Sequence, residues 1–196
     1  VNTANKYIGQ REDNSNYLTN CDLSQLSFFH YELSSSQVDT LYNNGAPGDI
    51  SSLNPKRLYE LNASEIFNST STEWSVDNNV YPSVYKSSLN FNGSSNYIDT
   101  PQINLGSTNT ISFWINTTTT TDGTLFGDPN GFSDYALFYQ PSTNRTAFRL
   151  GNNDSGYYQI QVSSGLLNDG NWHHHCLTRD GVTINYYIDG TLQTNV

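Results

Sequence analysis

The chain has 196 residues, a length that suits one domain with a sizeable hydrophobic core. Its formal net charge of −10, with 8 Lys and Arg against 18 Asp and Glu, argues against nucleic acid and an anionic membrane as partners. Abundant Ser, Thr, Asn, Gly and Tyr indicate a β-rich protein, and the lack of a long apolar run argues against membrane insertion.

The first two predicted elements are strands. Residues 6–9 read as a short strand that ends at a glycine, and residues 23–30 as a longer one. In the longer strand, the two-residue period places Leu26 and Phe28 on one face. This face is therefore predicted to be buried.

A short amphipathic helix is predicted near residues 34–44. Ser34 is the predicted N-cap, and Gly45 stands where a C-cap glycine is expected. The apolar positions that recur at helical spacing are Val38, Leu41 and Tyr42. This stripe predicts that one face of the helix packs against the rest of the protein.

Residues 46–86 have the composition of a linker. Pro47 and Pro55 mark turns, and a short strand is predicted near residues 58–61. Residues 44–53 resemble the inter-repeat linkers of large surface and virion proteins. This resemblance implies an extracellular location or a place on the surface of a virion.

Most of the remaining chain reads as strands. Apolar and β-branched residues alternate with polar ones, and turn residues separate the segments. The predicted strands lie at residues 135–140, 146–151 and 157–162.

A tight hairpin is predicted near the end of the sequence. Its strands, residues 172–180 and 182–188, are joined at Gly181, which supplies the positive φ that such a turn needs. The run of histidines in the first strand suggests a metal site. Adjacent strand residues point to opposite faces, however, so only His173 and His175 share a side, and packed histidines are the favoured interpretation.

The hairpin carries a family resemblance. Residues 170–181 read G-N-W-H-H-H-C-L-T-R-D-G and residues 186–190 read Y-Y-I-D-G, and they resemble the central hairpin of laminin-G-like and pentraxin-like domains of the concanavalin A-like superfamily. Residues 88–99 and 110–115 resemble the opening strand and the next strand of that family. The resemblance implies an all-β fold, a jelly-roll β-sandwich of two antiparallel sheets with one short helix near residues 34–44.

The start of the chain resembles the end of the same domain. Residues 1–45 are expected to be its C-terminal part, with the last strands and closing helix, and residues 87–196 its N-terminal and central part, with residues 46–86 as the linker. A window across a tandem array, a circular permutation and strand exchange between chains all fit, and the absence of Met favours an excerpt. All three arrangements predict that the first part packs on the sheet formed by the last.

A calcium site is one interpretation of the loop after residue 127. Asp128, Asn130 and Asp134 offer the hard oxygen ligands that Ca²⁺ prefers. The same residue types build ordinary turns, which is the favoured interpretation. Asn92 and Asn96 stand where the family often has Asp, and this argues against a metal ion at their turn.

A glycan site is a second interpretation of the same half of the chain. Sugar recognition needs flat apolar rings together with planar amide or carboxylate groups. The side chains expected to provide them on one rim are Tyr135, Tyr139, Asn152, Asp154 and Tyr157. Exposed tyrosines are also common on sandwiches without a ligand, so a plain surface stays the alternative.

The cysteines leave their redox state open. Cys21 and Cys176 pair only if the fold brings their Cα atoms within bonding range. Otherwise they are buried free thiols, and on sequence grounds the two alternatives are equal.

Catalysis is not expected. Glycosidases of the same superfold need a pair of carboxylates that flank the scissile bond, and laminarinase-like members carry it in the motif E-x-D-x-x-E. Residues 87–196 contain no Glu, and the chain has no G-x-S-x-G, H-E-x-x-H or phosphate-loop motif.

The expected function is therefore a non-catalytic structural or adhesive module of an extracellular or virion surface protein. Its expected partners are a host or cell-surface glycan or protein, and neighbouring copies of the same chain or repeat. The alternative is a calcium-dependent carbohydrate-binding lectin, the one interpretation that requires a cofactor, and a glycoside hydrolase is less favoured.

Overall fold

The computed structural model describes most of the chain, in separate stretches. These are residues 6–9, 19–59, 75–77, 81–82, 88–101, 105–127, 135–140, 145–152, 156–163 and 168–195.

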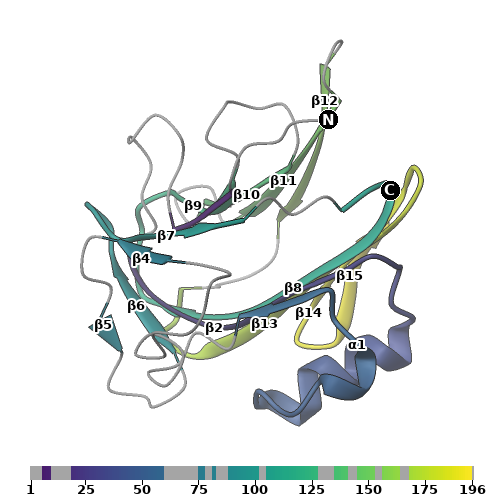
Figure 1. Ribbon diagram of the computed structural model, residues 1–196, viewed down its shortest axis with the longest axis horizontal. Helices are drawn as coiled ribbons and strands as arrows, with labels where there is room; N and C mark the ends of the chain where they lie inside the picture. The colour runs from purple at the N-terminus through teal and green to yellow at the C-terminus, as the bar shows by residue number, and fades with distance from the viewer. Residues whose placement is uncertain are drawn as a thin grey trace.

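The described strands form two antiparallel sheets that pack face to face, and helix α1 lies on the outer side of the larger sheet (Figure 1). This arrangement confirms the predicted all-β jelly-roll sandwich with one short α-helix. The sandwich gives every long strand one face toward the other sheet, which is why its sequence alternates between apolar and polar residues.

The larger sheet has eight strands. Seven follow the order β15-β14-β13-β8-β2-β6-β5, and β3 pairs with β2. Their bounds are β15 Thr191–Asn195, β14 Thr183–Ile188, β13 Trp172–Asp180, β8 Thr108–Thr117, β2 Thr19–Phe29, β6 Leu89–Asn92, β5 Tyr81–Pro82 and β3 Arg57–Tyr59.

The smaller sheet has seven strands in the order β12-β11-β10-β9-β1-β7-β4. Their bounds are β12 Gly156–Ser163, β11 Arg145–Asn152, β10 Tyr135–Gln140, β9 Gly123–Gly127, β1 Lys6–Ile8, β7 Tyr97–Thr100 and β4 Ser75–Asp77.

The two strands nearest the start of the chain lie inside the sheets rather than at their edges. Strand β1 pairs with β7 and β9, and β2 pairs with β6 and β8. These four partner strands come from residues 89–127 of the same chain, so the first part packs on the last part within one molecule. That residues 1–45 and 87–196 are the end and the beginning of a family domain stays a prediction.

Where it is described, the segment predicted as a linker is part of the sandwich. The strand expected near residues 58–61 is β3, at Arg57–Tyr59, and it pairs with β2. Ile50 and Leu53 are buried in the apolar cluster that also contains Val38 and Leu41 of α1. Strands β4 and β5 also come from this segment.

A bulge in β2 keeps its apolar side chains on the inner face. The register of β2 on β8 shifts around Gln25, whose φ of 46° lies in the left-handed region. The irregularity turns Leu23 toward the core together with Leu26 and Phe28, although Leu23 is an odd number of residues away. The predicted common face of Leu26 and Phe28 is confirmed.

Helix α1 spans Ser35–Tyr42 and begins as predicted. The Ser34 side chain accepts a hydrogen bond from the Gln37 backbone N–H, and the Gln37 side chain accepts one from the Ser34 N–H, which completes a capping box. The predicted C-cap is wrong: Asn43, with φ of 44°, ends the helix, and a 3₁₀ turn η1 (Asn43–Gly45) follows. Asparagine tolerates the left-handed region well enough to end the helix earlier than Gly45.

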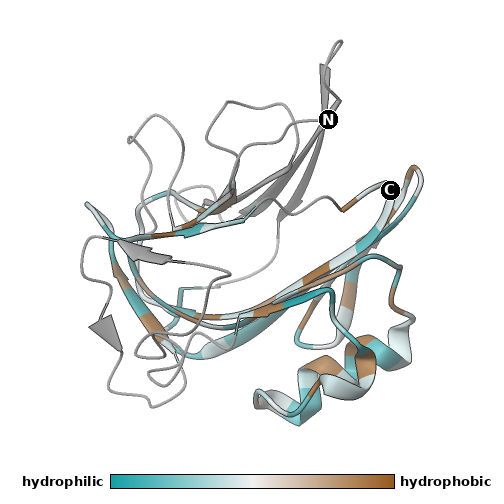
Figure 2. Cartoon of the chain, viewed as in Figure 1, coloured by the Kyte–Doolittle hydropathy of each residue, from teal (hydrophilic) through white to brown (hydrophobic). Residues whose placement is uncertain are grey.

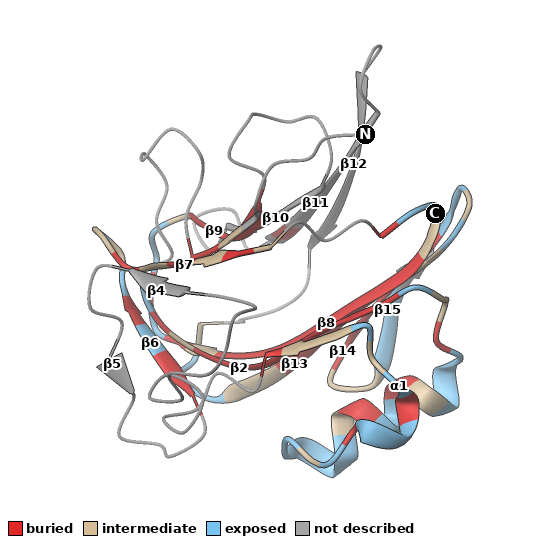
Figure 3. Cartoon of the chain, in the orientation of Figure 1, coloured by how far each residue is buried: buried red, intermediate tan, exposed pale blue. Residues whose placement is uncertain are grey.

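Two apolar clusters hold these elements together, and Figure 2 shows hydrophobic residues recurring along the larger sheet and on α1. The first cluster lies between the sheets and includes Phe28, Phe91, Phe126 and Leu177. The second attaches α1 and a 3₁₀ turn η2 (Ser51–Leu53) to the outer face of the larger sheet. Its members are Phe29, Leu33, Val38, Leu41, Ile50, Leu53, Cys176 and Tyr187. Strand β8 is therefore covered on both faces and buried along its length (Figure 3).

Candidate functional site

The histidine run of β13 and the carboxylates of Asp169 and Asp189 form a group of neighbouring titratable side chains. The histidine run pairs with β8 along one edge of the strand, and from His175 onward it also pairs with β14 along the other edge. The described contacts place His174 toward α1 and His175 in the space between the sheets. The alternation predicted from the sequence is therefore confirmed for this pair.

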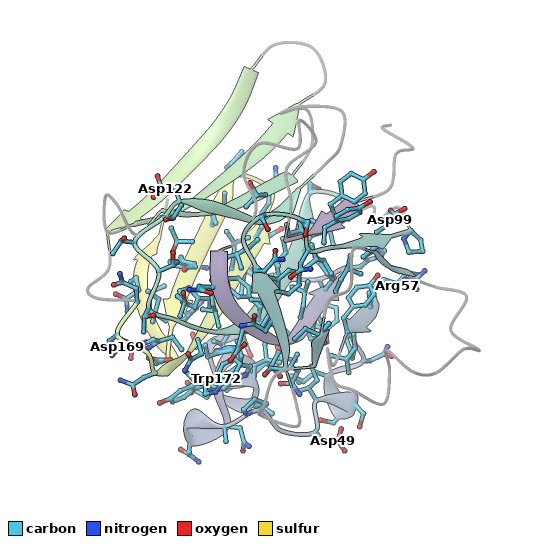
Figure 4. All side chains as sticks on the ribbon, turned by 90° about the vertical axis from the view of Figure 1, so that its left-hand side faces the viewer. Asp49, Arg57, Asp99, Asp122, Asp169 and Trp172 are labelled. Carbon is cyan, nitrogen blue, oxygen red and sulfur yellow. The ribbon has the colours of Figure 1, made fainter. Side chains whose placement is uncertain are left out.

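His173 stands at the open end of the strand, between two carboxylates. Its Nδ1 lies 2.8 Å from an oxygen of Asp189, and its Nε2 lies 3.2 Å from an oxygen of Asp169. Asp169 also accepts hydrogen bonds from the backbone and the side chain of Asn171, both at 2.8 Å. Figure 4 shows Asp169 and Trp172 on the same lower side of the molecule, where β13 begins.

The two carboxylates favour the charged form of this imidazole. The hydrogen bond that His173 donates to Asp189 raises the pKa of His173 against the opposing effect of burial, and Asp169 adds to the increase. Burial acts to raise the pKa of Asp189, but hydrogen bonds from His173 and from the His174 backbone N–H outweigh it and lower the pKa. Hydrogen bonds from Asn171 lower the pKa of Asp169. Asp169, His173 and Asp189 thus form a charged cluster that connects the start of β13 to the turn after β14.

His174 is buried and uncharged near neutral pH. Burial lowers its pKa to about 4, although Asp189 acts in the opposite direction. Its Nε2 lies 2.8 Å from the hydroxyl of Ser112 on β8, and its ring lies beside Trp114 and Tyr42. Its neutral state and its hydrogen bond to a neighbouring strand are those of a packed side chain.

His175 lies in the core between the sheets. Its Nδ1 makes a short hydrogen bond with the hydroxyl of Tyr186, and its ring stacks on Phe113 at 5.0 Å. Burial lowers its pKa to about 3. Its contacts, like those of His174, support the interpretation of the run as packed histidines.

No metal ion site is found among the residues that the structure describes, where no group of three or more His, Cys, Asp or Glu side chains is placed to hold one. The predicted calcium ligands Asp128, Asn130 and Asp134 lie outside the described residues. The calcium site therefore stays a prediction.

The predicted glycan ligands are placed only in part. Asp154 lies outside the described residues, and for the other four the structure gives backbone positions alone. In the register of the smaller sheet, Tyr135 is paired with Leu150 and Tyr139 with Thr146. Tyr157 is paired with Gly151, and Asn152, the last residue of β11, is paired with Gly156. The glycan site therefore stays a prediction.

The Asn92 turn between β6 and β7 is closed by its own side chains. The Asn92 side-chain oxygen accepts hydrogen bonds from the backbone N–H groups of Ser94 and Ser95, at 3.0 and 3.1 Å. The Asn96 side-chain oxygen accepts from the Asn92 N–H at 2.9 Å. Both amides therefore serve the turn itself, a role that needs no ion.

Both cysteines are free thiols. Cys21 belongs to the cluster between the sheets and Cys176 to the cluster under α1, so the body of the larger sheet separates them. Burial raises the pKa of Cys21 to about 12 and raises that of Cys176 as well. Neither thiol has the lowered pKa of a nucleophilic cysteine.

Two described carboxylates outside the charged cluster make structural contacts. Glu32 accepts a hydrogen bond from the Asn185 side chain at 3.1 Å and lies 3.4 Å from the hydroxyl of Thr178. Asp22 accepts one from the Asn90 side chain at 2.8 Å. Within the described part of the chain, no helix is long and apolar enough to cross a membrane.

Sequence reasoning missed the partners of His173. Asp189 was interpreted only as a turn residue, and Asp169 attracted no prediction. The available signal was local: Asp169 precedes the histidine by four residues, and Asp189 occupies the next Asp-Gly turn along the chain. No sequence pattern predicts the contact of Ser112 with His174, because it depends on the pairing of β8 with β13.

A comparison with family models matches residues 92–196, more than half of the chain, to a laminin G model described as the concanavalin A-like lectin/glucanases superfamily. The search of curated proteins found no match. The search of solved structures found none either.

Proposed function

Because this chain belongs to the concanavalin A-like lectin/glucanase superfamily, we propose that it is a non-catalytic structural or adhesive module of an extracellular or virion surface protein. Family membership supports a lectin-like or structural module in general. The surface location, the partners and the absence of catalysis are our proposal.

The observation that carries the proposal is how the described carboxylates are used. Asp169 and Asp189 hold His173, and Glu32 binds Asn185. A glycosidase instead needs an acid and a base or nucleophile free to face the substrate, about 5–9.5 Å apart. No Glu occurs between residues 87 and 196, which further supports a binding or structural role over hydrolysis.

The proposed partners are a host or cell-surface glycan or protein and neighbouring copies of the chain. The net charge of −10 supports partners other than nucleic acid and anionic lipid. Glycan binding on the β10–β12 side, with the predicted side chains of Tyr135, Tyr139, Asn152, Asp154 and Tyr157, is the part of the proposal that needs a direct test.

The test combines a glycan array with a measurement of molar mass by light scattering. The proposal predicts no release of product from any glycan, together with either chelator-resistant glycan binding or regular association between chains. Hydrolysis of a glycan contradicts it. Binding that is lost with chelator and in Asp134→Ala, but kept in the control Asp49→Ala, identifies the calcium-dependent lectin instead.

A further inference from the structure

Two buried aromatic rings lie side by side under helix α1. Trp114 on β8 and His174 on β13 are direct register partners, their rings are 5.1 Å apart, and both residues are almost completely buried. Among the described residues, neither the Trp114 Nε1–H nor the His174 Nδ1 has a hydrogen-bond partner. Buried polar groups without a partner are rare and costly, so this pair indicates a bound group that is not part of the described chain.

The other side of the histidine ring is already satisfied. His174 Nε2 lies 2.8 Å from the Ser112 hydroxyl, and burial keeps the imidazole neutral. Nδ1 is therefore either an acceptor or the one N–H donor of the ring, depending on the tautomer. Trp114 Nε1–H is a donor in every case. The bound group must accept from the indole and either donate to or accept from the imidazole.

The surrounding charges limit which chemical group can bind to Trp114 and His174. A carboxylate is disfavoured, because Asp189 binds the His174 backbone N–H and Asp39 lies next to Gly190. A cation is disfavoured because the indole offers only a donor. A neutral hydroxyl meets both requirements, since its oxygen accepts while its hydrogen donates.

Tyr42 covers this pair. Its ring stacks on Trp114 at 5.9 Å, nearly parallel, and lies 6.2 Å from the ring of His174. The left-handed residues Asn43 and Asn44 follow Tyr42 directly, so the covering residue stands at the end of the regular helix. We expect a group larger than water to need displacement of the Tyr42 ring.

We propose that a hydroxyl group, of a buried water or of a saccharide, bridges Trp114 Nε1 and His174 Nδ1 beneath Tyr42. The water source is independent of the proposed function. The saccharide source rests on the proposed glycan binding, and it would be a second glycan site, under Tyr42 and apart from the one proposed on the β10–β12 side.

The test is a nuclear Overhauser measurement on the unaltered protein, labelled with ¹⁵N. The Trp114 indole signal is assigned by elimination with Trp172→Phe and Trp74→Phe, which leave the buried pair intact. We expect a cross-peak between the Trp114 indole proton and a long-lived water, and no such cross-peak at half-buried Trp172. An indole proton with cross-peaks to protein protons alone overturns the proposal.

Methyl glycosides of glucose, galactose and mannose distinguish the two sources. Replacement of the water cross-peak by sugar cross-peaks, strengthened in Tyr42→Ala and unchanged in Thr40→Ala, assigns the hydroxyl to a saccharide. If the water cross-peak persists in the presence of each methyl glycoside, the hydroxyl belongs to water. If no glycan on the array binds the protein, the proposed glycan binding is wrong, and the proposed water site is unaffected.

Discussion

The three adjacent histidines of β13 have three different environments, and the environment decides the charge of each. His173 lies between Asp169 and Asp189 with a raised pKa, whereas burial lowers the pKa of His174 and of His175. The difference follows from position on the strand, because His173 is at the end that stays open to solvent. Only His173 therefore links protonation to stability near neutral pH.

We expect His173→Asn to lower the free energy of unfolding by about 1 kcal/mol at about pH 5.5, and by less at about pH 9. The folded-state pKa of His173 is raised, so its contribution is complete below its ordinary pKa of about 6.5 and is lost as pH rises through the raised value. Urea denaturation at both pH values measures the effect.

Exposed His30 supplies the matched control, as His30→Asn, because it makes the same substitution outside the group of Asp169, His173 and Asp189. An equal loss of unfolding free energy for His173→Asn at both pH values would contradict this expectation. It would show that His173 stabilises the fold by packing and that the charged cluster adds no stability.

Both thiols are expected to be protected in the folded protein. Cys21 and Cys176 are buried and their pKa values are raised, so neither exposes a thiolate. Without reductant, a chromogenic disulfide reagent should detect no thiol in buffer and two per chain in denaturant. Detection of none in denaturant would reveal a disulfide and contradict the separation of the two residues.

At the level of elements, the turn between β14 and β15 joins the larger sheet to α1. Asp189 and Gly190 both have positive φ, 48° and 72°, as a type I′ turn requires. Gly190 lies against the helix, since a Cβ there would stand 3.1 Å from Tyr42 and 3.3 Å from Asp39. The same short turn thus contacts His173 through Asp189 and contacts the end of α1 through Gly190.

We expect Gly190→Ala to be more destabilising than Gly181→Ala. Each substitution places a side chain at positive φ, which costs about 1 kcal/mol. Gly181 has open space around it, whereas a Cβ at Gly190 displaces Tyr42, and we expect a further loss of about 1 kcal/mol. Thermal unfolding of the two variants gives the comparison, and equal losses would show that α1 yields freely at this contact.

At the level of the whole molecule, the order of strands in space differs from their order in sequence. Strand β1 separates β9 from β7, and β2 separates β8 from β6. Each sheet is thus completed by residues that are about 70 or more positions away in the sequence from the strands they pair with. The two parts of the chain are expected to fold as one unit.

Deletion of residues 1–45 should abolish folding, because it removes β1, β2 and α1 and leaves both apolar clusters incomplete. Circular dichroism and thermal denaturation would then show no cooperative transition. Deletion of residues 1–5 alone, which keeps every described strand, is the matched control.

A fragment of residues 46–196 that melts cooperatively as a monomer would contradict this expectation. Recovery of the native transition when a peptide of residues 1–45 is added would show that the missing strands can be supplied by a second molecule, as strand exchange between copies requires.

Local pattern was enough to predict most of the elements. Apolar alternation predicts β10 to β12, the turn at Gly181 predicts the β13–β14 hairpin, and Ser34 predicts the start of α1. These features depend on residues within a few positions of one another, where backbone geometry and capping chemistry act directly. The C-cap at Asn43 escaped prediction because two residue types suited to the left-handed region lie next to each other.

The sequence by itself thus determined the sandwich, its family and the alternating faces of the histidine strand. Only the tertiary structure decided that β1 and β2 lie inside the sheets, that Cys21 and Cys176 are separated, and that Asp169 and Asp189 hold His173. It also placed Trp114 beside His174 under Tyr42. The physical reason is that side-chain alternation is a local property of a strand, whereas the choice of neighbouring strands depends on burial across the entire chain.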